Sequence, residues 1–261
     1  CYYFHENQFA YPPNDRQVVC VEPQMVQLYG ALAAQRILFN SAYNRDSFVD
    51  GVDALLRKMP DAVPEGIARD LAARAEVLPI PIPDIRSLSE RNPCLIVWNH
   101  RWEYDKAPEI FVGALTGLAR DGVDFRLALL GRRPADAPAS LRRLRRELGG
   151  RIVVDGELDT AAYRRVLGTA AIVVSTAIHE FQGLAVMEAA GAGCRPLVPD
   201  ALCYREQYPA AYRYPAGDSA ALRARLRDWL TGGLPAAVDV TAWREASLLR
   251  RWECLLRVGA H

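Results

Sequence analysis

The feature that most constrains the fold is the alternation of short apolar runs with longer amphipathic segments from residue 94 onward. The apolar runs have the length and composition of buried strands, and the segments between them have helical periodicity. The runs read CLIVWN, FRLALLG, RIVVDGEL, AIVVST and RPLVPD, and the helical segments are 108–120, 141–148, 160–168 and 183–192. Such alternation predicts βαβ units and an α/β fold with a parallel sheet. Right-handed crossovers gather the loops after the strands at one edge, where open α/β sheets bind ligands.

The first third of the chain shows a shorter version of this alternation. Strands are expected at Tyr2 to His5 and at the run RILFNS, and helices at 23–34, at 41–56 with Ser41 as N-cap, and at 67–74. The run VLPIPIPD follows, and its prolines exclude a helix, so we expect an extended hinge there. At most two strands precede it, fewer than a sheet usually has, and we therefore expect further residues upstream of Cys1.

We predict three parts in the chain, and the hinge separates the first part from the second. Residues 1–83 form a partial Rossmann-like domain, residues 84–236 a second Rossmann-like domain, and residues 237–261 a C-terminal helix that packs back towards the first domain. Helices are expected at 220–230 and 241–258.

The composition excludes several classes of protein. The net charge of +1 gives no chain-wide basic surface of the kind that nucleic-acid-binding proteins carry. The six cysteines form no C-x-x-C pair, so we expect reduced, mostly buried cysteines of a cytoplasmic protein rather than a zinc or redox site. No apolar run approaches the roughly 20 residues that span a bilayer. We therefore expect a cytoplasmic protein without a membrane span.

Two glutamates, Glu180 and Glu188, lie in the stretch STAIHEFQGLAVMEA after an expected strand. They could form an acid–base pair, a metal site, or two parts of a ligand grip; a surface residue and a helix cap are the alternative. A helix starting near Gly183 would place unpaired N–H groups and a positive dipole end between them, which suits a phosphate. Because Glu180 precedes that helix and Glu188 lies inside it, we expect them to hold two parts of one extended ligand.

A second group of charges follows the strand CLIVWN. Arg101 and Lys106 lie five residues apart in the loop before the next helix, and a guanidinium beside an ammonium suits a diphosphate. Two solvated loop charges are the alternative. His100 could contact a ligand or be satisfied by the backbone, and we favour the backbone.

A third group follows the first strand, where His5 and Glu6 could position a hydroxyl or act as a base, or belong to a structural loop. The four histidines show no metal-ligand spacing, so no metal site is predicted. The G-x-G-x-x-G fingerprint and the G-x-S-x-G elbow are both absent, which disfavours hydride transfer and serine hydrolysis.

The pair Glu180-x7-Glu188 followed by AAGAGCRPLVP resembles the donor-binding signature of the retaining glycosyltransferases of family 4. Arg101 and Lys106 have the spacing of that family's glycine-arginine-x4-lysine motif, although Asn99-His100 stands where the glycine is usual. The runs YFHENQFAYP, ILFNSAYNRDSF and VWNHRWEYDKAPEIF resemble, more narrowly, the tRNA-queuosine mannosyltransferase family. These matches together run from residue 2 to residue 258.

The resemblance implies a GT-B architecture, in which two Rossmann-like domains share an active site. The N-terminal domain, incomplete at its start, would bind the acceptor, and residues 84–236 would bind a nucleotide sugar. The implied catalytic residues are His5, Arg101, Lys106 and Glu180; the implied donor-binding residues are Phe181, Gln182, Gly183, Leu184 and Glu188; the acceptor-side candidates are Glu6 and Asn7.

The resemblance also implies a reaction. A hexose, with mannose from GDP-mannose expected, would pass with retention to an acceptor, expected to be the queuosine nucleoside of a tRNA, with no cofactor and no metal. A lipid, polysaccharide or small-molecule acceptor, or a nucleotide-sugar-binding module without turnover, is the alternative. The arginine-rich segments 141–147 and 243–251 could supply positive surface for tRNA, but solvated helix faces are the favoured interpretation.

Overall fold

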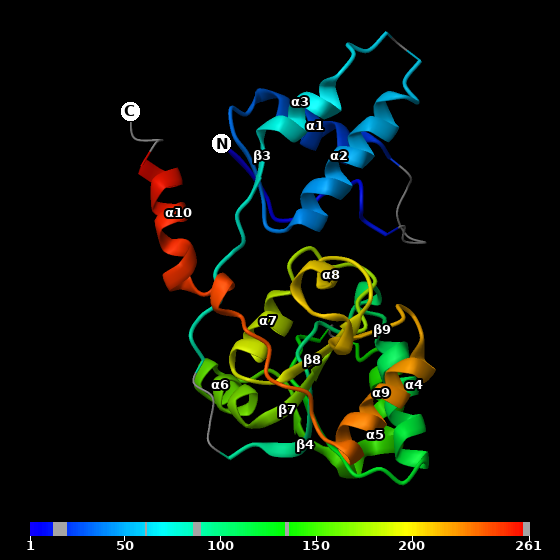
Figure 1. Cartoon of the computed structure of the whole chain (residues 1–261). Helices are drawn as coiled ribbons and strands as arrows, with labels where there is room; N and C mark the ends of the chain where they lie inside the picture. The colour runs from blue at the N-terminus through cyan, green and yellow to red at the C-terminus, as the bar shows by residue number, and fades with distance from the viewer. Residues whose placement is uncertain (13–19, 61, 86–89, 134–135, 258–261) are drawn as a thin grey trace. The chain divides into compact units, whose positions relative to one another are not determined.

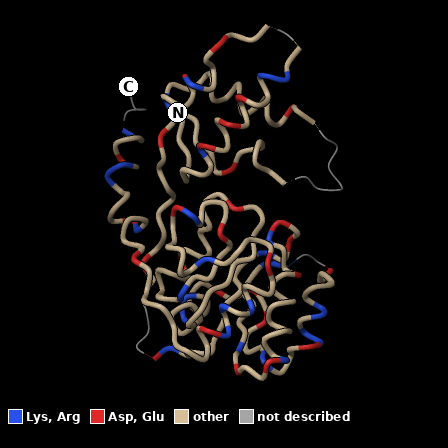
Figure 2. Tube along the Cα trace, turned by 45° about the vertical axis from the view of Figure 1, so that its right-hand side comes forward, with Lys and Arg blue, Asp and Glu red and all other residues tan. Residues whose placement is uncertain are grey.

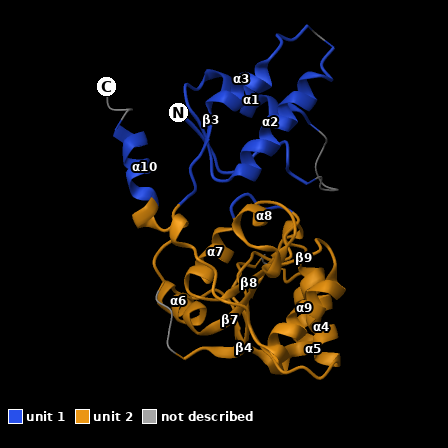
Figure 3. Cartoon of the chain, viewed as in Figure 1, with its two compact units in different colours: residues 1–80, 179–182, 248–261 blue, residues 81–178, 183–247 orange. Residues whose placement is uncertain are grey.

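The computed structural model describes residues 1–12, 20–60, 62–85, 90–133 and 136–257. The chain divides into two compact units (Figure 3). Unit 1 contains Cys1–Ile80, the short segment His179–Gln182 and the chain from Leu248 onward. Unit 2 contains Pro81–Ile178 and Gly183–Ser247.

Unit 1 is built on a parallel sheet of order β1-β2-β3, with strands Tyr2–Phe4, Ile37–Phe39 and Ala75–Val77. Its N-terminal part also holds helices α1 (Glu22–Ala33), α2 (Ala42–Leu56) and α3 (Ile67–Arg74). Ser41 caps α2 as predicted, because its side chain accepts a hydrogen bond from the amide of Asn44.

The prediction of at most two strands in this part is wrong. β3 begins directly after the last residue of α3 and runs parallel to β2, with Phe39 opposite Val77. Only three residues pair, and the proline-rich run follows at once. A strand this short shows no alternation of its own, so the sequence gives no signal that separates it from the hinge.

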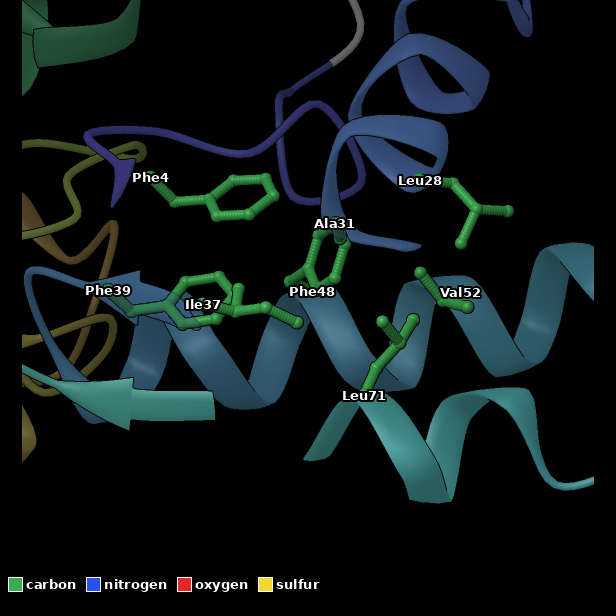
Figure 4. Close-up of a cluster of buried hydrophobic side chains, with 8 residues drawn as sticks. All are labelled: Phe4, Leu28, Ala31, Ile37, Phe39, Phe48, Val52 and Leu71. Carbon is green, nitrogen blue, oxygen red and sulfur yellow. The ribbon is translucent and has the colours of Figure 1, made fainter. Parts of the chain in front are cut away.

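Stacked aromatic side chains form the core of unit 1 (Figure 4). The rings of Phe4 and Phe39, on neighbouring strands, lie 4.6 Å apart and nearly parallel, and Phe48 of α2 packs 4.6 Å from Phe4. Leu28 and Leu71 extend this cluster towards α1 and α3. Each helix therefore contributes an apolar side chain to one face of the sheet.

Unit 2 contains a six-stranded parallel sheet of order β6-β5-β4-β7-β8-β9. Its strands are β4 (Asn92–Trp98), β5 (Arg126–Leu129), β6 (Ile152–Asp155), β7 (Ala170–Val174), β8 (Arg195–Pro199) and β9 (Arg213–Tyr214). β7 and the last four residues of β4 are buried, as expected for central strands covered on both faces. The predicted α/β class with parallel sheets is confirmed.

Helices cover both faces of this sheet (Figure 1). α6 and α7 lie on one face, and α4, α5 and α9 lie on the other, where α4 packs against both α5 and α9. Their bounds are α4 Pro108–Arg120, α5 Ala139–Leu148, α6 Thr160–Thr169, α7 Leu184–Gly191, α8 Tyr204–Gln207 and α9 Ser219–Gly232. The 3₁₀ turns are Tyr104–Lys106, Gly149–Arg151, Ala210–Tyr212 and Thr241–Trp243. Sequence patterns did not predict α8 or β9, which are only four and two residues long.

The strand order reverses between β4 and β7. The chain moves outward through β5 and β6 on one side, returns, and continues through β8 and β9 on the other. Ligands of open α/β sheets bind at such a reversal, outside the carboxyl ends of the strands. The loops after β4 and β7 are therefore where a ligand site is expected, and they carry Arg101, Lys106, Glu180 and Gly183.

Helix α10 (Glu245–Arg257) starts in unit 2 and continues in unit 1. Within unit 1, Leu248 packs with Leu38 and Leu78, and the indole of Trp252 donates a hydrogen bond to the carbonyl of Pro79. Among the described helices, none is long and apolar enough to cross a membrane.

The prediction that the cysteines are mostly buried is wrong. Cys194 and Cys203 are buried, but Cys1, Cys20 and Cys254 are exposed. Their positions explain this, because the two buried cysteines flank strand β8, whereas the exposed ones lie at the chain start, beside α1 and on α10.

Candidate functional site

The loops after β4 and β7 are bonded directly to each other within unit 2. Thr176 donates its hydroxyl to the carbonyl of Lys106 at 2.7 Å, and the amide of Ile178 donates to the carbonyl of Asp105 at 2.9 Å. These two bonds therefore fix the backbone of Lys106 to the residues that follow β7 and lead to Glu180.

The loop after β5 packs against the same place. Gly131 touches the backbone of His100, since a Cβ at this glycine would lie 1.5 Å from the His100 carbonyl oxygen. The amide of Trp102 donates to the carbonyl of Arg132 at 3.2 Å. Three strand-end loops thus meet at the switch point, as the alternation of strands and helices predicts.

The two cations of the β4–α4 loop have different environments. Lys106 ends the 3₁₀ turn, is only 7% exposed, and has its ammonium 3.0 Å from the carboxylate of Asp105. Arg101 is exposed and lies 3.4 Å from Glu103. A buried cation is held in place and weakly screened by water, whereas an exposed one is mobile and strongly screened. Lys106 is therefore the better fixed of the two cations, and the buried carboxylate of Asp105 offsets part of its charge.

His100 is buried beside them, and its ring lies 5.3 Å from that of Trp98 in an edge-to-face arrangement. The His100 ring therefore forms part of the packing of this loop.

Helix α7 carries Glu188 and begins after Gly183. Gly183 adopts a left-handed conformation with φ of 69°, which only glycine adopts without strain, and it turns the chain from the loop into the helix. The first turn of α7 contains Leu184 and no acidic residue. Its amide groups and the positive end of the helix dipole therefore face no carboxylate from this turn, as an anion site requires.

Glu188 is half-buried and has a defined partner. The hydroxyl of Tyr163 on α6 donates to its Oε2 at 3.0 Å. Burial raises the pKa of Glu188, while the hydrogen bond from Tyr163 and the charge of Arg164 lower it. Burial and the Glu188 charge raise the pKa of Tyr163, which therefore stays a neutral donor.

A cavity of about 270 Å³ opens beside this pair, entirely within unit 2. Its wall combines an apolar part with a polar end formed by Tyr163, Arg164 and Glu188; the full lining is Pro83, Ile85, Leu158, Thr160, Tyr163, Arg164 and Glu188. Few convergent polar groups in an otherwise apolar hollow are typical of a small-molecule site. The carboxylate at its end suits a ligand with hydroxyl donors.

The segment His179–Gln182 belongs to unit 1, where its side chains are largely buried. His179 packs 4.3 Å from the ring of Tyr11 and 4.7 Å from that of Phe181. Gln182 donates to the carbonyl of Ile80 at 2.7 Å and accepts from its amide at 3.0 Å. The Gln182 side chain is thus engaged by the chain, so the backbone of this residue, rather than its side chain, is suited to a ligand.

Glu180 is the least buried residue of that segment. It lies in unit 1, and Glu188 lies in unit 2. The two carboxylates therefore belong to different units, with Glu180 before α7 and Glu188 within it.

The residues predicted after β1 differ in their exposure. His5 and Glu6 are exposed, and the His5 ring lies 4.8 Å from that of Tyr3. Asn7 is completely buried, and its amide nitrogen donates to Asn44 and to Ser47. This burial favours a structural role for Asn7 over contact with an acceptor.

Asparagines hold the loop that carries His5. Asn40 donates to the carbonyl of His5 at 2.8 Å, and Asn44 donates to the carbonyl of Phe4 at 3.0 Å. Asn44 also donates to Asn40, which completes the network. Asn40 and Asn44, both in the run ILFNSAYNRDSF, thus fix the backbone that carries His5.

Two site residues were not predicted as such from the sequence. Tyr163 lies in an amphipathic segment of ordinary composition. Its contact with Glu188 depends on how α6 and α7 lie in the folded chain. Asn99 was noted only for replacing a glycine, yet it donates to both Tyr163 and the carbonyl of Ala185. A polar residue at a strand end beside the switch point was the available signal.

Charges of both signs are interspersed along both units (Figure 2). The arginines of α5 illustrate this, because Arg143 pairs with Glu147 and Arg145 with Asp155. In the part of the chain that the structure describes, no group of three or more histidine, cysteine, aspartate or glutamate side chains is placed to hold a metal ion. The loops after β4 and β7 carry two cations, Arg101 and Lys106, each beside a carboxylate of the same loop.

Comparison with known proteins gives two family matches. Residues 1–82 match the family described as tRNA-queuosine alpha-mannosyltransferase N-terminal, and residues 93–232 match the family described as glycosyl transferases group 1. A curated relative, tRNA-queuosine alpha-mannosyltransferase of Drosophila melanogaster, is 34% identical over 226 residues. That match includes 81% of this chain and 60% of the relative, so the chain spans less than two thirds of that protein's length.

Solved structures of similar fold include sucrose-phosphate synthase from Thermosynechococcus elongatus, with a TM-score of 0.73 at 15% identity over 98% of this chain and 66% of that one. The pneumococcal O-GlcNAc transferase in complex with UDP and GlcNAc gives a TM-score of 0.70 at 14% identity over 95% of this chain and 50% of that one. At these identities the likeness concerns the fold alone, which is that of the GT-B glycosyltransferases.

Proposed function

The chain belongs to the group 1 glycosyltransferases and, within them, to the tRNA-queuosine alpha-mannosyltransferase family, and from this premise we propose that it transfers mannose from GDP-mannose to the queuosine nucleoside of a tRNA. The reaction would retain the configuration at the sugar carbon. The proposal includes a cytoplasmic location, where tRNA and nucleotide sugars meet, and requires neither a cofactor nor a metal ion.

The observation that carries the proposal is the cavity beside Glu188 at the reversal of strand order. The cavity combines an apolar hollow with the carboxylate of Glu188. The loop that carries Lys106 is hydrogen-bonded to the residues that follow β7, and the chain continues from these residues into α7, which carries Glu188. A nucleoside diphosphate needs these three elements: a hollow for its base, an acceptor for its ribose hydroxyls, and positive charge for its phosphates.

We assign the donor contacts accordingly. Glu188 accepts hydrogen bonds from the ribose, and the N-terminal end of α7, with the backbone from Phe181 to Leu184, binds phosphate. Lys106 and Arg101 neutralise the diphosphate. As the bond to the sugar breaks, negative charge grows on the leaving phosphate, and fixed positive charge stabilises it most there.

The sugar and the acceptor take the remaining candidates. Glu180 is the residue we assign to the donor sugar, and His5, the remaining catalytic candidate, lies with Glu6 in residues 1–83, the part we assign to the acceptor. Residues 84–236 hold the donor. The departing phosphate oxygen takes the proton of the attacking acceptor hydroxyl, so no second carboxylate is needed as a nucleophile, in contrast to retaining glycosidases.

Nucleotide release tests the proposal. The purified full chain is incubated with a panel of nucleotide sugars and total tRNA, and free nucleoside diphosphate is measured. We expect release of GDP from GDP-mannose above all other donors, and release at least tenfold slower from Glu188→Ala. Glu245→Ala, which removes an exposed carboxylate at the start of α10, is the matched control and should behave as the wild type.

Each contrary result has a defined meaning. Release that depends on a small molecule, lipid or polysaccharide in place of tRNA changes the acceptor and keeps the class of enzyme. Binding of a nucleotide sugar without release from any donor indicates a binding module. The absence of both contradicts the proposal.

A further inference from the structure

The Tyr163 hydroxyl lies between two groups from other elements. It donates to Glu188 Oε2 at 3.0 Å, and the side-chain amide of Asn99, at the end of β4, donates to the hydroxyl oxygen at 3.3 Å. Asn99 also donates to the carbonyl of Ala185 in the first turn of α7 at 2.7 Å. The chain of bonds therefore joins the end of β4, helix α6 and helix α7.

The donors and acceptors in this chain have fixed directions. A carbonyl oxygen can only accept, so the bond to Ala185 requires that the nitrogen of the Asn99 amide faces it. The same nitrogen donates to the Tyr163 oxygen, and the single hydroxyl hydrogen of Tyr163 is then directed to Glu188. Glu188 keeps Oε1 and the second lone pair of Oε2 for other donors.

We propose that Tyr163 is a positioning residue for the nucleotide: anchored by Asn99, it holds the Glu188 carboxylate so that its remaining lone pairs face the cavity and accept both vicinal hydroxyls of the ribose. This inference rests on the proposed function and adds selectivity to it. A nucleotide that lacks one of the two hydroxyls leaves a half-buried carboxylate lone pair unmatched, and the site discriminates against it.

The charges around Glu188 make the role of Tyr163 measurable. The titratable groups that act on Glu188 are Tyr163 and Arg164, both on α6; Asn99 is neutral, and the other cavity residues, Pro83, Ile85, Leu158 and Thr160, do not titrate in the range of interest. Cys194 acts on Tyr163 and is itself kept neutral, because burial raises its pKa to about 12.

The ionised carboxylate accepts hydrogen bonds more strongly than its protonated form, in which one oxygen carries a proton. Nucleotide affinity is therefore full above the pKa of Glu188 and falls as the pH falls through it. The Tyr163 hydrogen bond lowers that pKa, so its removal moves the loss of affinity to higher pH.

The test is calorimetric titration of the full chain with GDP between pH 5 and 8.5. Tyr163→Phe should weaken GDP binding about tenfold at neutral pH, the typical effect of one hydrogen bond to a charged group, and should shift the acidic loss of affinity upward. Tyr29→Phe, an exposed tyrosine on α1, is the matched control and should leave both quantities unchanged.

A double-mutant cycle separates positioning from a general structural effect. In a Glu188→Gln background, Tyr163→Phe should change GDP affinity by less than twofold, and the pH dependence should be lost. A tenfold loss that persists in that background overturns the inference, because Tyr163 then acts independently of the carboxylate.

The wild-type protein supplies a readout that needs no variant. Both 2′-deoxy-GDP and 3′-deoxy-GDP should bind at least tenfold more weakly than GDP, and equal binding of all three overturns the inference. If the wild type binds no nucleoside diphosphate at all, the proposed function fails and this inference with it. If the wild type binds GDP and Tyr163→Phe binds it equally with the same pH profile, this inference alone fails.

Discussion

Gly131→Ala tests how closely the loops after β4 and β5 must pack. The new Cβ would lie 1.5 Å from the carbonyl oxygen and 2.4 Å from the carbonyl carbon of His100, and 3.2 Å from the amide nitrogen of Arg101. All three are backbone atoms, so no rotamer change relieves the clash. Because ordinary contact begins at 3.4 Å, the two loops must separate by about 1.9 Å, the difference from 1.5 Å.

The expected cost follows from this displacement. Overpacking of a rigid site destabilises by about 1–3 kcal/mol, and a backbone clash belongs at the upper end. For a unit of this size, about 3 kcal/mol lowers the melting temperature by roughly 6–12 °C. The moved loop carries Arg101 and Lys106, and a displacement of about 1 Å in a catalytic group can reduce the rate about hundredfold.

The assay pairs differential scanning calorimetry with nucleotide release from GDP-mannose. Gly149→Ala is the matched control, because its Cβ would meet no atom within 4 Å and its φ of −52° suits any residue. We expect the control to melt and react as the wild type. If Gly131→Ala melts within 1 °C of the wild type and keeps at least half of its activity, the close packing of these loops does not hold the site together and the reasoning is refuted.

Three further predictions concern single side chains. Lys106→Ala should reduce kcat/KM for nucleotide release at least ten times more than Arg101→Ala does, because the buried ammonium is less screened than the exposed guanidinium. Steady-state kinetics of the two variants decides the order. Asn44→Ala should lower the free energy of unfolding by about 2–4 kcal/mol, since it removes the buried donor of the Phe4 carbonyl and of Asn40 Oδ1, whereas Asp50→Ala, exposed on the same helix, should change it by less than 0.5 kcal/mol in a urea titration. The KM for GDP-mannose should rise as the pH falls through the raised pKa of Glu188 and should lose this dependence in Glu188→Gln; a pH-independent KM in the wild type contradicts the role of the carboxylate.

Elements with strong local signals were predicted closely from the sequence. Helix α4 has Pro108 at its first position and α3 ends at Arg74, and both helices have the predicted bounds. Strands β3 and β9 were missed because two or three paired residues carry no periodicity of their own. Their existence depends on a neighbouring strand that is already in place, which is tertiary information.

The candidate site residues also divide into those with a local sequence signal and those without one. Glu188, Lys106 and Arg101 were singled out by their place after buried strands, but solvated or capping roles explained them as well; their assignment to a donor site came from the resemblance of their spacing to the family 4 motifs. Tyr163 was not, since its role depends on the 3.0 Å approach of one helix to another. The burial of Asn7 was also out of reach, because a polar residue in a loop gives no sign that Asn44 and Ser47 of α2 will accept hydrogen bonds from its amide.

The most direct test of the central claim is the mass of the modified nucleoside. The full chain is incubated with GDP-mannose and tRNA that carries queuosine. The tRNA is digested, and the nucleosides are separated and their masses measured by mass spectrometry. We expect that queuosine gains the mass of one hexose, that Glu188→Ala reduces this gain at least tenfold, and that tRNA with guanosine in place of queuosine gains nothing. Queuosine that keeps its mass, while the sugar passes to another acceptor and GDP is released, would contradict the transfer to queuosine.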